Sequence, residues 1–527
     1  MKKNIKLKVL ILIFLLISVL YPLVNMITNI SWEDFNELIS SKAFLSSLTN
    51  SLTVTSISTI ISVLIAYFLA YALNKTNIKH RAILRVLLTL PMLIPSISHG
   101  LGLINLFGKN GIISSIFHFN IIGKTGVIMG SILYSFPVAF LMLDDSFNYI
   151  DNSLYDSAKV LGLNKWQTFK TVTFTYLKKS ILSAIFAVFT LIFTDYGVPL
   201  AVGGKFITLP VFLYKEVIGL LNFSKGTIIS LFLLIPAFVS FLFDTLSKDY
   251  AHGDFNQESK IEENKTRDII SSVFVYIVLI CTFSIIGSFV YYGFIDNFIL
   301  NNTFSLVHLN YILNGNVLNY IFNSLLIAVI VSIIGTFIAY FAAYITARTS
   351  GIASKIVHIM TISSLAIPGI VLGLSYTISF KGTFIYNTYF ILIIVNIVHF
   401  IASPYLMAYN ALQKVNPNYE IVAKTCNISM INIIKDVIIP CTKKTIREMI
   451  AYFFVNSMIT ISAVTFLFNT RTMPVSLLIN DFESNLMLGE AAIISLIILF
   501  FNCLVKGSIY LINRKEHKRS ENYEVNV

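Results

Sequence analysis

The amino-acid sequence predicts an all-α polytopic membrane protein with about twelve transmembrane helices, arranged as two parallel six-helix repeats. Three observations predict this fold class. Of the 527 residues, 56% are hydrophobic and only 12% are charged, about half the charge of an ordinary soluble domain. Apolar stretches long enough to cross a bilayer recur along the whole chain. One sequence pattern also occurs twice, once in each half, which indicates a duplicated unit.

The duplicated pattern needs no gap, and its two copies lie 273 residues apart, as Asn50 and Asn323 do. The first copy contains Asn50-Ser51-Leu52, Ala66-Tyr67-Phe68, Pro95 and Gly100-Leu101, and the second contains Asn323-Ser324-Leu325, Ala339-Tyr340-Phe341, Pro368 and Gly373-Leu374. Because these stretches are apolar enough to lie in a bilayer, we expect the two copies to face each other across an interface within the membrane.

The apolar stretches give six spans to each half. They lie near 8–29, 48–74, 83–107, 124–146, 179–200 and 226–246, and near 269–293, 317–346, 356–378, 385–410, 445–468 and 486–512. Each is long enough to cross the hydrocarbon core as a helix. The stretch between the halves is polar and mixed in charge, which is typical of a linker. We therefore expect a first repeat at 1–246, a linker at 247–268, a second repeat at 269–513 and a cytoplasmic tail at 514–527.

Basic residues follow spans that end on the same side of this arrangement. They include Lys75, Lys79, Arg81 and Arg85 after the second span, and Arg514, Lys515, Lys518 and Arg519 at the C-terminus. The positive-inside rule then places both termini in the cytoplasm. Since each half has an even number of spans, both copies insert in the same sense, and their pseudo-two-fold axis runs along the membrane normal.

Charge and cysteine content favour none of the common alternative classes. The formal net charge is +12, but the basic residues sit at span ends, so we expect no nucleic-acid partner. The four cysteines show neither paired nor metal-type spacing, and no metal, cofactor or catalytic residue is predicted. Gly123-Lys124-Thr125 resembles the end of a phosphate-binding loop, but the first glycine is missing and no strand–helix junction surrounds it.

The longest cytoplasmic loop of each half falls between its fourth and fifth spans, near 150–178 and near 414–443. Each loop has the pattern of a short helix, a break and a second amphipathic stretch. Gly162 suits the first break because glycine takes positive φ without penalty, and Asn427 occupies the same place in the second loop. Small side chains at Ser157 and Ala158 should let another protein approach closely. We interpret each loop as a docking helix.

These two loops resemble the EAA loop of binding-protein-dependent ABC importer permeases. The matching positions are Asp156, Ser157, Ala158 and Gly162 in the first half, and Val422, Ala423, Asn427 and Pro440 in the second. Two departures stand out: Thr175 replaces the first proline of the motif, and the acid of the second loop, Glu420, lies one place early. The plainer alternative is a pair of amphipathic helices lying on the lipid headgroups.

The resemblance implies a fused permease with a MetI-like fold in the bacterial plasma membrane. It implies that the loops dock onto a separate dimer of ABC ATPase subunits, which hydrolyses the ATP, so that this chain is not itself an enzyme. It also implies an extracytoplasmic solute-binding protein as a second partner. ATP-driven closure of the ATPase dimer would then switch the two halves between outward-open and inward-open states.

Polar or broken places within the spans are the candidates for the translocation pathway, because they are costly in lipid and usually face a cavity. Pro95 and His99 lie in the third span, and Pro368 and Gly373 occupy the ninth. Asp195 lies near the end of the fifth span. For His99 and the prolines, helix kinking is the simpler interpretation. For Asp195, substrate contact and simple exposure to water stay open as alternatives.

Two short segments, Asp195–Pro199 and Ser457–Leu467, resemble fused permeases assigned to 2-aminoethylphosphonate uptake. Fused iron(III) permeases usually carry Glu-Leu-Pro-Ala-Thr at this place, which this chain lacks, and thiamine permeases share only the architecture. The resemblance therefore implies 2-aminoethylphosphonate or a related phosphonate as the cargo, with iron(III) or thiamine as alternatives. An ion-coupled secondary transporter is the remaining alternative, but it would require acids near mid-membrane, which are nearly absent.

Overall fold

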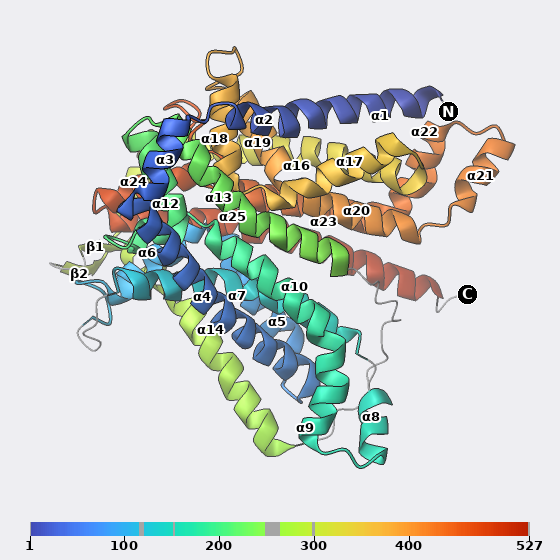
Figure 1. The fold of residues 1–527 in the computed structure, drawn as a ribbon. Coiled ribbons are helices and arrows are strands. Elements are labelled where there is room, and N and C mark those ends of the chain that lie inside the picture. The colour runs from blue at the N-terminus through green and yellow to red at the C-terminus, as the bar shows by residue number, and fades with distance from the viewer. Residues whose placement is uncertain (1, 115–120, 151–152, 248–263, 298–300, 525–527) are drawn as a thin grey trace.

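The computed structural model describes residues 2–114, 121–150, 153–247, 264–297 and 301–524 as a bundle of helices (Figure 1). By length and composition, eight helices can each cross a membrane, and three bent helix pairs raise the number of spans to 11. These eleven coincide with predicted spans. The twelfth prediction, 445–468, falls on α23 (Ile439–Ile459), whose first turns carry Lys443, Lys444 and Arg447 and so make it less apolar.

The first half consists of helices and short helical turns. They are α1 (Lys2–Leu15), η1 (Leu16–Leu20), α2 (Tyr21–Ile27), α3 (Trp32–Ser40), α4 (Lys42–Lys75), α5 (Arg81–Thr89), η2 (Leu90–Leu93), α6 (Ser96–Phe107), α7 (Lys124–Asn148), α8 (Ser153–Val160), α9 (Lys165–Thr168), η3 (Phe169–Thr173), α10 (Phe174–Phe193), α11 (Gly197–Val202), α12 (Leu209–Tyr214), η4 (Lys215–Gly219) and α13 (Phe223–Ser247). The central residues of the predicted linker, 248–263, lie outside the described residues.

The second half repeats this order and adds a small antiparallel hairpin. Its elements are α14 (Lys265–Gly293), β1 (Ile295–Asn297), β2 (Asn301–Phe304), α15 (Val307–Asn314), α16 (Val317–Arg348), α17 (Ile352–Ser363), η5 (Ser364–Ala366), α18 (Gly369–Phe380), α19 (Tyr389–Phe400), α20 (Ala402–Lys414), α21 (Asn418–Thr425), α22 (Met430–Ile433), η6 (Ile434–Ile438), α23, α24 (Val475–Ser484) and α25 (Leu488–Glu524). α25 continues through most of the predicted tail, so the tail does not start a separate segment at 514.

The third span of each half is sharply bent at a proline. The chain turns by 97° between η2 and α6, where Pro95 stands, and by 111° between η5 and α18, where Pro368 stands. The cause is local, because the residue before a proline is disfavoured in the helical region. Ile94 accordingly has φ −113° and ψ 151°, and Ile367 has φ −104° and ψ 109°. The predicted breaks at Pro95 and Pro368 are therefore present.

The first span of each half packs against the other half. Figure 1 shows α1 along the yellow and orange helices of the second half, and α14 along the blue helices of the first. At one contact the Tyr376 hydroxyl donates to the Ser18 carbonyl oxygen at 2.6 Å. At the other, a Cβ placed on Gly102 would lie 2.4 Å from Ile285 Cγ2, so the glycine is what allows α6 and α14 to touch. The repeats are separate in the sequence but interlocked in space.

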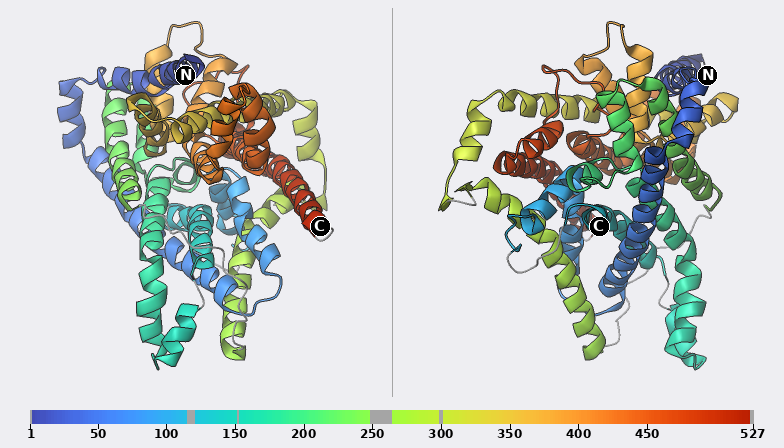
Figure 2. Two further views of the ribbon diagram at one scale, coloured as in Figure 1. Left: turned by 90° about the vertical axis from the view of Figure 1, so that its right-hand side faces the viewer. Right: turned by 60° about the vertical axis from the view of Figure 1, so that its left-hand side comes forward.

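Contacts between the halves continue through the bundle. The hydroxyls of Ser98 and Ser495 are 2.9 Å apart, and Asn502 Nδ2 donates to the Leu93 carbonyl oxygen at 2.8 Å. One continuous hydrophobic core includes buried residues of both halves. In Figure 1, α8 with α9, α21 with α22 and both chain termini lie toward one end of the bundle, and the β1–β2 hairpin lies at the other; Figure 2 gives two further views.

Candidate translocation cavity and coupling loops

Each of the two loops consists of a helix, a left-handed break and a second short helix, as predicted. In the first loop α8 and α9 flank Gly162, which has φ 70°. In the second, α21 and α22 flank Asn427, which has φ 56°. Only glycine takes this conformation freely, and asparagine is among the few other residues that tolerate it. The sequence therefore determines the shape of both loops locally.

The alanines of the two loops face inward. Ala158 is 3% exposed and Ala423 is 4% exposed, and their carbonyl oxygens accept from the backbone N–H of Leu163 at 3.0 Å and of Ile428 at 2.8 Å. Burial of the Ala158 side chain means that it is not itself on the outer face, and its role in admitting a partner stays a prediction. Ser157, in contrast, is exposed as expected.

Both loops enter the fifth span through a π-helical turn at the same place, Phe169–Thr173 and Ile434–Ile438. Before it, Asn164 caps α9 through a reciprocal hydrogen-bond pair with Gln167. Pro440 is the second residue of α23, which directly follows the π-helical turn, so the missing N–H of the proline coincides with the place where the helical hydrogen-bond pattern changes.

The outer faces of the loops are apolar and solvent-exposed. Val160, Leu161 and Trp166 of the first loop are 87%, 75% and 70% exposed. In the second loop Val422 is exposed and lines an open groove of about 470 Å³ that runs past Ala423. Large exposed apolar patches of this kind mark protein–protein contact sites. Asp156 is exposed on the same segment, so its carboxylate is accessible from outside.

Glu420 points into the protein, unlike Asp156. Its carboxylate accepts from the Tyr344 hydroxyl at 3.1 Å and lies 3.4 Å from Arg348 Nε, both at the end of α16. The first loop has a corresponding contact at the end of α4, where Lys75 Nζ lies 4.3 Å from the centre of the Tyr155 ring. α8 and α21 are therefore each attached to the second span of their own half. The sequence signal was the early position of the acid, and its partner Arg348 was missed.

A small cavity of about 100 Å³ lies where the broken spans of the two halves meet. Its walls come from α6, α7 and the break after α10 in the first half, and from α19, α23 and the turns that follow α23 in the second. Its lining includes Ser96, Tyr134, Asp195, Tyr196 and Gly197, and on the other side His399, Phe400, Asn456, Thr460 and Ser462. Within the part of the chain that the structure describes, the lining contains a carboxylate, phenols, an imidazole and hydroxyls, but neither lysine nor arginine.

Asp195 is held rigidly at the break between α10 and α11. Its carboxylate oxygens accept from the backbone N–H of Gly197 at 3.3 Å and of Val198 at 3.0 Å. Ser96 also hydrogen-bonds to this carboxylate. Hydrogen-bond donors from both the fifth and the third span therefore hold the carboxylate in place and restrict rotation of the Asp195 side chain.

The cavity has equivalent positions in both halves, which the sequence repeat alone could have revealed. Asp195 and Thr460 stand 265 residues apart, and so do Tyr134 and His399. The first half thus contributes an acid and a phenol where the second contributes a hydroxyl and an imidazole. Within the described residues, His399 Nδ1 is buried without a hydrogen-bond partner. A buried polar atom of this kind is a group that water or cargo can satisfy.

Small residues let the third and fifth spans approach around the cavity. A Cβ on Gly197 would lie 2.3 Å from Ser96 Oγ and 2.8 Å from the Ile97 backbone nitrogen. In the second half a Cβ on Gly369 would lie 2.4 Å from Ser462 Oγ. The same close approach is therefore built in both halves, with the glycine on the fifth span in one and on the third in the other.

Comparison with known proteins agrees with this geometry. The family described as "Binding-protein-dependent transport system inner membrane component" matches twice, over residues 58–249 and 335–518. The chain belongs to this permease family. The permease is therefore a multi-pass inner-membrane component of an ABC importer, with two family domains fused in one chain. The duplication and the resemblance predicted from the sequence are confirmed.

The permease is similar to several curated relatives. It is 24% identical to the ferric transport system permease protein FbpB of Actinobacillus pleuropneumoniae, over 82% of this chain and 67% of the relative. A putative ferric transport permease of Haemophilus influenzae is 23% identical over 73% of this chain and 64% of the relative. The thiamine transport permease ThiP of Brucella suis is 26% identical, but over only 26% of this chain and 27% of its own. The permease thus spans about two thirds of the length of the two ferric relatives.

Of the five residues predicted for the pathway, Asp195 lines the cavity and the other four shape its surroundings. Pro95 and Pro368 produce the bends that bring α6 and α18 to it. His99 lies one turn into α6, where its ring stands edge-on to Tyr134 at 5.6 Å between ring centres. A Cβ on Gly373 would lie 2.8 Å from the Ala463 carbonyl oxygen, so Gly373 serves close packing. Helix bending and packing explain these four residues.

Proposed function

We propose that the permease forms the membrane channel through which an ATP-driven importer moves iron(III) inward. A solute-binding protein delivers the cargo at the end that carries the β1–β2 hairpin. Two ATPase subunits dock at the opposite, cytoplasmic end, one on each loop. The observation that carries the cargo assignment is the lining of the cavity between the halves.

The lining suits a metal cation better than an anion. Carboxylate, phenolate-type and imidazole side chains are the ligands that iron takes in proteins. A phosphonate would instead require lysine, arginine or a cluster of backbone N–H donors, and the lining has neither basic side chain. The volume of about 100 Å³ holds about three water molecules, which suits an ion with part of its hydration shell. The names of the relatives that cover most of the chain support the same cargo.

The alternative cargos are supported by fewer observations. The prediction of 2-aminoethylphosphonate depends on two short segments, and the relatives described above are named for ferric iron and thiamine. It stays a prediction. Thiamine is supported by a match to about a quarter of the chain.

The docked loops transmit the closing motion of the ATPase pair to the membrane helices. The apolar outer faces bind the ATPase pair, and the Glu420–Arg348 and Tyr155–Lys75 contacts transmit its closure to α16 and α4. Because α4 and α16 pack against the spans that line the cavity, closure of the ATPase pair moves both walls. The cavity between the halves then opens alternately to each side.

A reconstitution experiment tests this proposal. The permease is placed in proteoliposomes with the ATPase subunit and the binding protein encoded near it, and uptake of radioactive iron(III), 2-aminoethylphosphonate and thiamine is compared. We expect ATP-dependent uptake of iron only. Uptake by the permease alone on an ion gradient contradicts the importer mechanism, and ATP-dependent uptake of the phosphonate contradicts the cargo assignment.

A further inference from the structure

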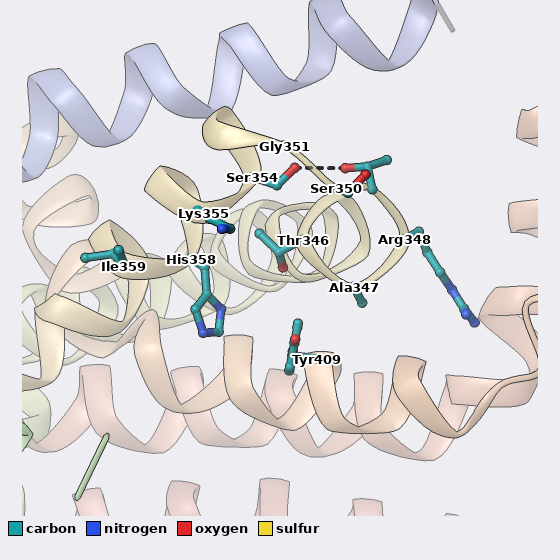
Figure 3. A pocket seen from close by; sticks show the side chains of 11 residues that line it. Thr346, Ala347, Arg348, Ser350, Gly351, Ser354, Lys355, His358, Ile359 and Tyr409 are labelled. Carbon is teal, nitrogen blue, oxygen red and sulfur yellow. Dashed lines mark hydrogen bonds between the residues drawn. The ribbon is translucent and has the colours of Figure 1, made fainter. Parts of the chain in front are cut away.

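A second, larger cavity lies at the loop-bearing end of the second half, away from the translocation cavity (Figure 3). Its volume is about 650 Å³, and it lies between the end of α16, the start of α17 and α20. Among the described residues, its lining includes the basic side chains of Arg348, Lys355 and His358 and five hydroxyl-bearing side chains, but no aspartate or glutamate. The lining is therefore complementary to an anion.

The equivalent place in the first half is closed by an ion pair. Arg85 Nε lies 2.9 Å from Asp144 Oδ2, and Asn74 Nδ2 donates to Asp144 Oδ1 at 2.6 Å. Arg85 also donates to Asn74 Oδ1 at 2.9 Å. These three side chains join the end of the second span to the third and fourth spans, and they neutralise the charge of Arg85 internally.

The second copy has lost all three members of this network. At the same repeat offsets, Ala347 stands for the asparagine, His358 for the arginine and Tyr409 for the aspartate. His358 instead packs on aromatic rings, with its centre 5.2 Å from that of Tyr409. In the second copy the shorter side chain at 347 leaves space, and the loss of the carboxylate leaves no acid among the described residues of the lining.

Positive charge remains at the edge of the cavity. Among the described residues Lys355 is exposed and has no ion-pair partner. In Figure 3, Arg348 points away from Lys355 and His358. Its guanidinium donates to the Val415 carbonyl oxygen at 2.7 Å and lies 3.4 Å from the Glu420 carboxylate. Lys355 is therefore free to bind an external anion, and Ser350 and Tyr409 add hydroxyl groups elsewhere in the lining.

The cavity opens beside a face of α17 that suits lipid. Ile352, Ile356 and Ile359 stand on one side of the helix and are 78%, 39% and 61% exposed. α17 begins shortly after α16 ends and forms a bent span with α18, so in the proposed orientation we expect this face near the headgroups of one leaflet. A molecule with an anionic head and apolar tails fits this combination, since its phosphate can meet Lys355 while its tails follow the isoleucines.

We propose that this cavity binds the headgroup phosphate of an anionic phospholipid of the inner leaflet, and that the first half has no such site. The assignment to the inner leaflet rests on the proposed orientation of the importer, with the loops in the cytoplasm. Free phosphate shares the headgroup's chemistry and is the other source of the same anion. The site lies next to the Arg348–Glu420 contact, so a bound lipid stabilises the end of α16 to which the docking helix is attached.

Native mass spectrometry of the full-length permease, purified with its ATPase partner, tests the site. The complex is incorporated into nanodiscs containing phosphatidylcholine and phosphatidylglycerol, released gently, and the retained lipids are counted. Lys355→Glu removes the free cation, and Lys414→Glu, on an exposed lysine of α20 outside the cavity lining, is the matched control. A triple variant, A347N/H358R/Y409D, rebuilds the ion-pair network of the first half and closes the cavity.

We expect the wild type and Lys414→Glu to retain one more phosphatidylglycerol than Lys355→Glu and the triple variant. Equal phosphatidylglycerol retention by wild type and Lys355→Glu overturns the lipid site. If, in addition, inorganic phosphate raises the melting temperature of delipidated wild type but not of Lys355→Glu, the ligand is the soluble anion. These readouts do not involve transport, so a failed cargo assignment leaves them unchanged.

Discussion

Replacing Gly162 by valine tests whether the shape of the first docking loop couples the permease to its ATPase. Gly162 has φ 70°, and a Cβ placed there has no neighbouring atom within 4 Å. The substitution therefore causes no steric clash with the rest of the protein. Its whole effect arises from the backbone, because a β-branched residue is strongly disfavoured in the left-handed region.

The magnitude follows from that single cost. Holding a residue other than glycine in the left-handed conformation costs about 1–2 kcal/mol. At about 1.4 kcal/mol for each factor of ten, the population of the loop in its docking conformation falls about five- to thirty-fold. The loop carries few buried side chains, so we expect the loss to appear in coupling and not in the stability of the membrane-embedded bundle.

Two substitutions serve as matched controls. Gly162→Asn introduces the residue that the second loop uses at φ 56°, at Asn427, so it should keep most of the coupling. Gly507→Val adds the same side chain at an open glycine within α25, where the backbone is helical. The assay is ATP hydrolysis by the reconstituted complex, stimulated by loaded binding protein, together with the amount of ATPase subunit that copurifies.

We expect stimulated hydrolysis to fall about five- to thirty-fold in Gly162→Val, within the cost estimated above, and to stay near wild type in both controls. If Gly162→Val hydrolyses ATP and retains its partner as the wild type does, the left-handed break is not needed for docking. Equal losses in Gly162→Val and Gly162→Asn contradict the backbone explanation and point to a contact made by the glycine itself.

Three further predictions concern other parts of the fold. Asp195→Asn keeps the size of the side chain but removes the charge in the cavity. Because hydrogen bonds to charged groups contribute about 1.5–3 kcal/mol, we expect iron uptake to fall at least about tenfold while the amount of protein in the membrane is unchanged. Unchanged uptake excludes a role of Asp195 in the pathway. Gly197→Ala places a Cβ 2.8 Å from the Ile97 backbone nitrogen, which cannot move away, so the melting temperature should drop, whereas Gly287→Ala, with open space, should leave it unchanged. His308 lies outside the spans, and its hydrogen bond to Glu490 at 3.0 Å raises the His308 pKa. The stability that this pair contributes is therefore complete below the ordinary histidine pKa and is lost as the pH rises through the raised value. Thermal unfolding of His308→Gln should lack this alkaline loss, and a pH profile identical to that of the wild type would refute the prediction.

The protonated form of His308 has a structural reason. Its Nδ1 faces the Glu490 carboxylate, and its Nε2 lies 3.0 Å from the Ile295 carbonyl oxygen. A carbonyl oxygen and an ionised carboxylate both accept hydrogen bonds, so both contacts are satisfied when the two ring nitrogens donate, as they do in the imidazolium. This pair joins the hairpin and α15 to the start of α25 at the end where the binding protein is proposed to dock.

Local physics explains why the sequence was sufficient for much of the fold. Span lengths follow from hydropathy, and the bends follow from Pro95 and Pro368 because a proline restricts the residue before it. Gly162 and Asn427 determine the breaks of the two loops for the same kind of reason. The duplication, the two docking loops and the family were accordingly predicted from residues that act within a few positions of themselves.

Contacts between distant segments had to come from the tertiary structure. The exchange of α1 and α14 between the halves, the inward turn of Ala158 and the Glu420–Arg348 contact all depend on which helices become neighbours, and hydropathy does not encode that choice. The cavity is the clearest case: Asp195 was predicted, but Tyr134, His399 and Thr460 join it only because two bent spans and two broken ones meet at the interface. Sequence determines what each segment is, because those preferences are local; packing decides which side chains share a site, because the fit between helices depends on the whole bundle.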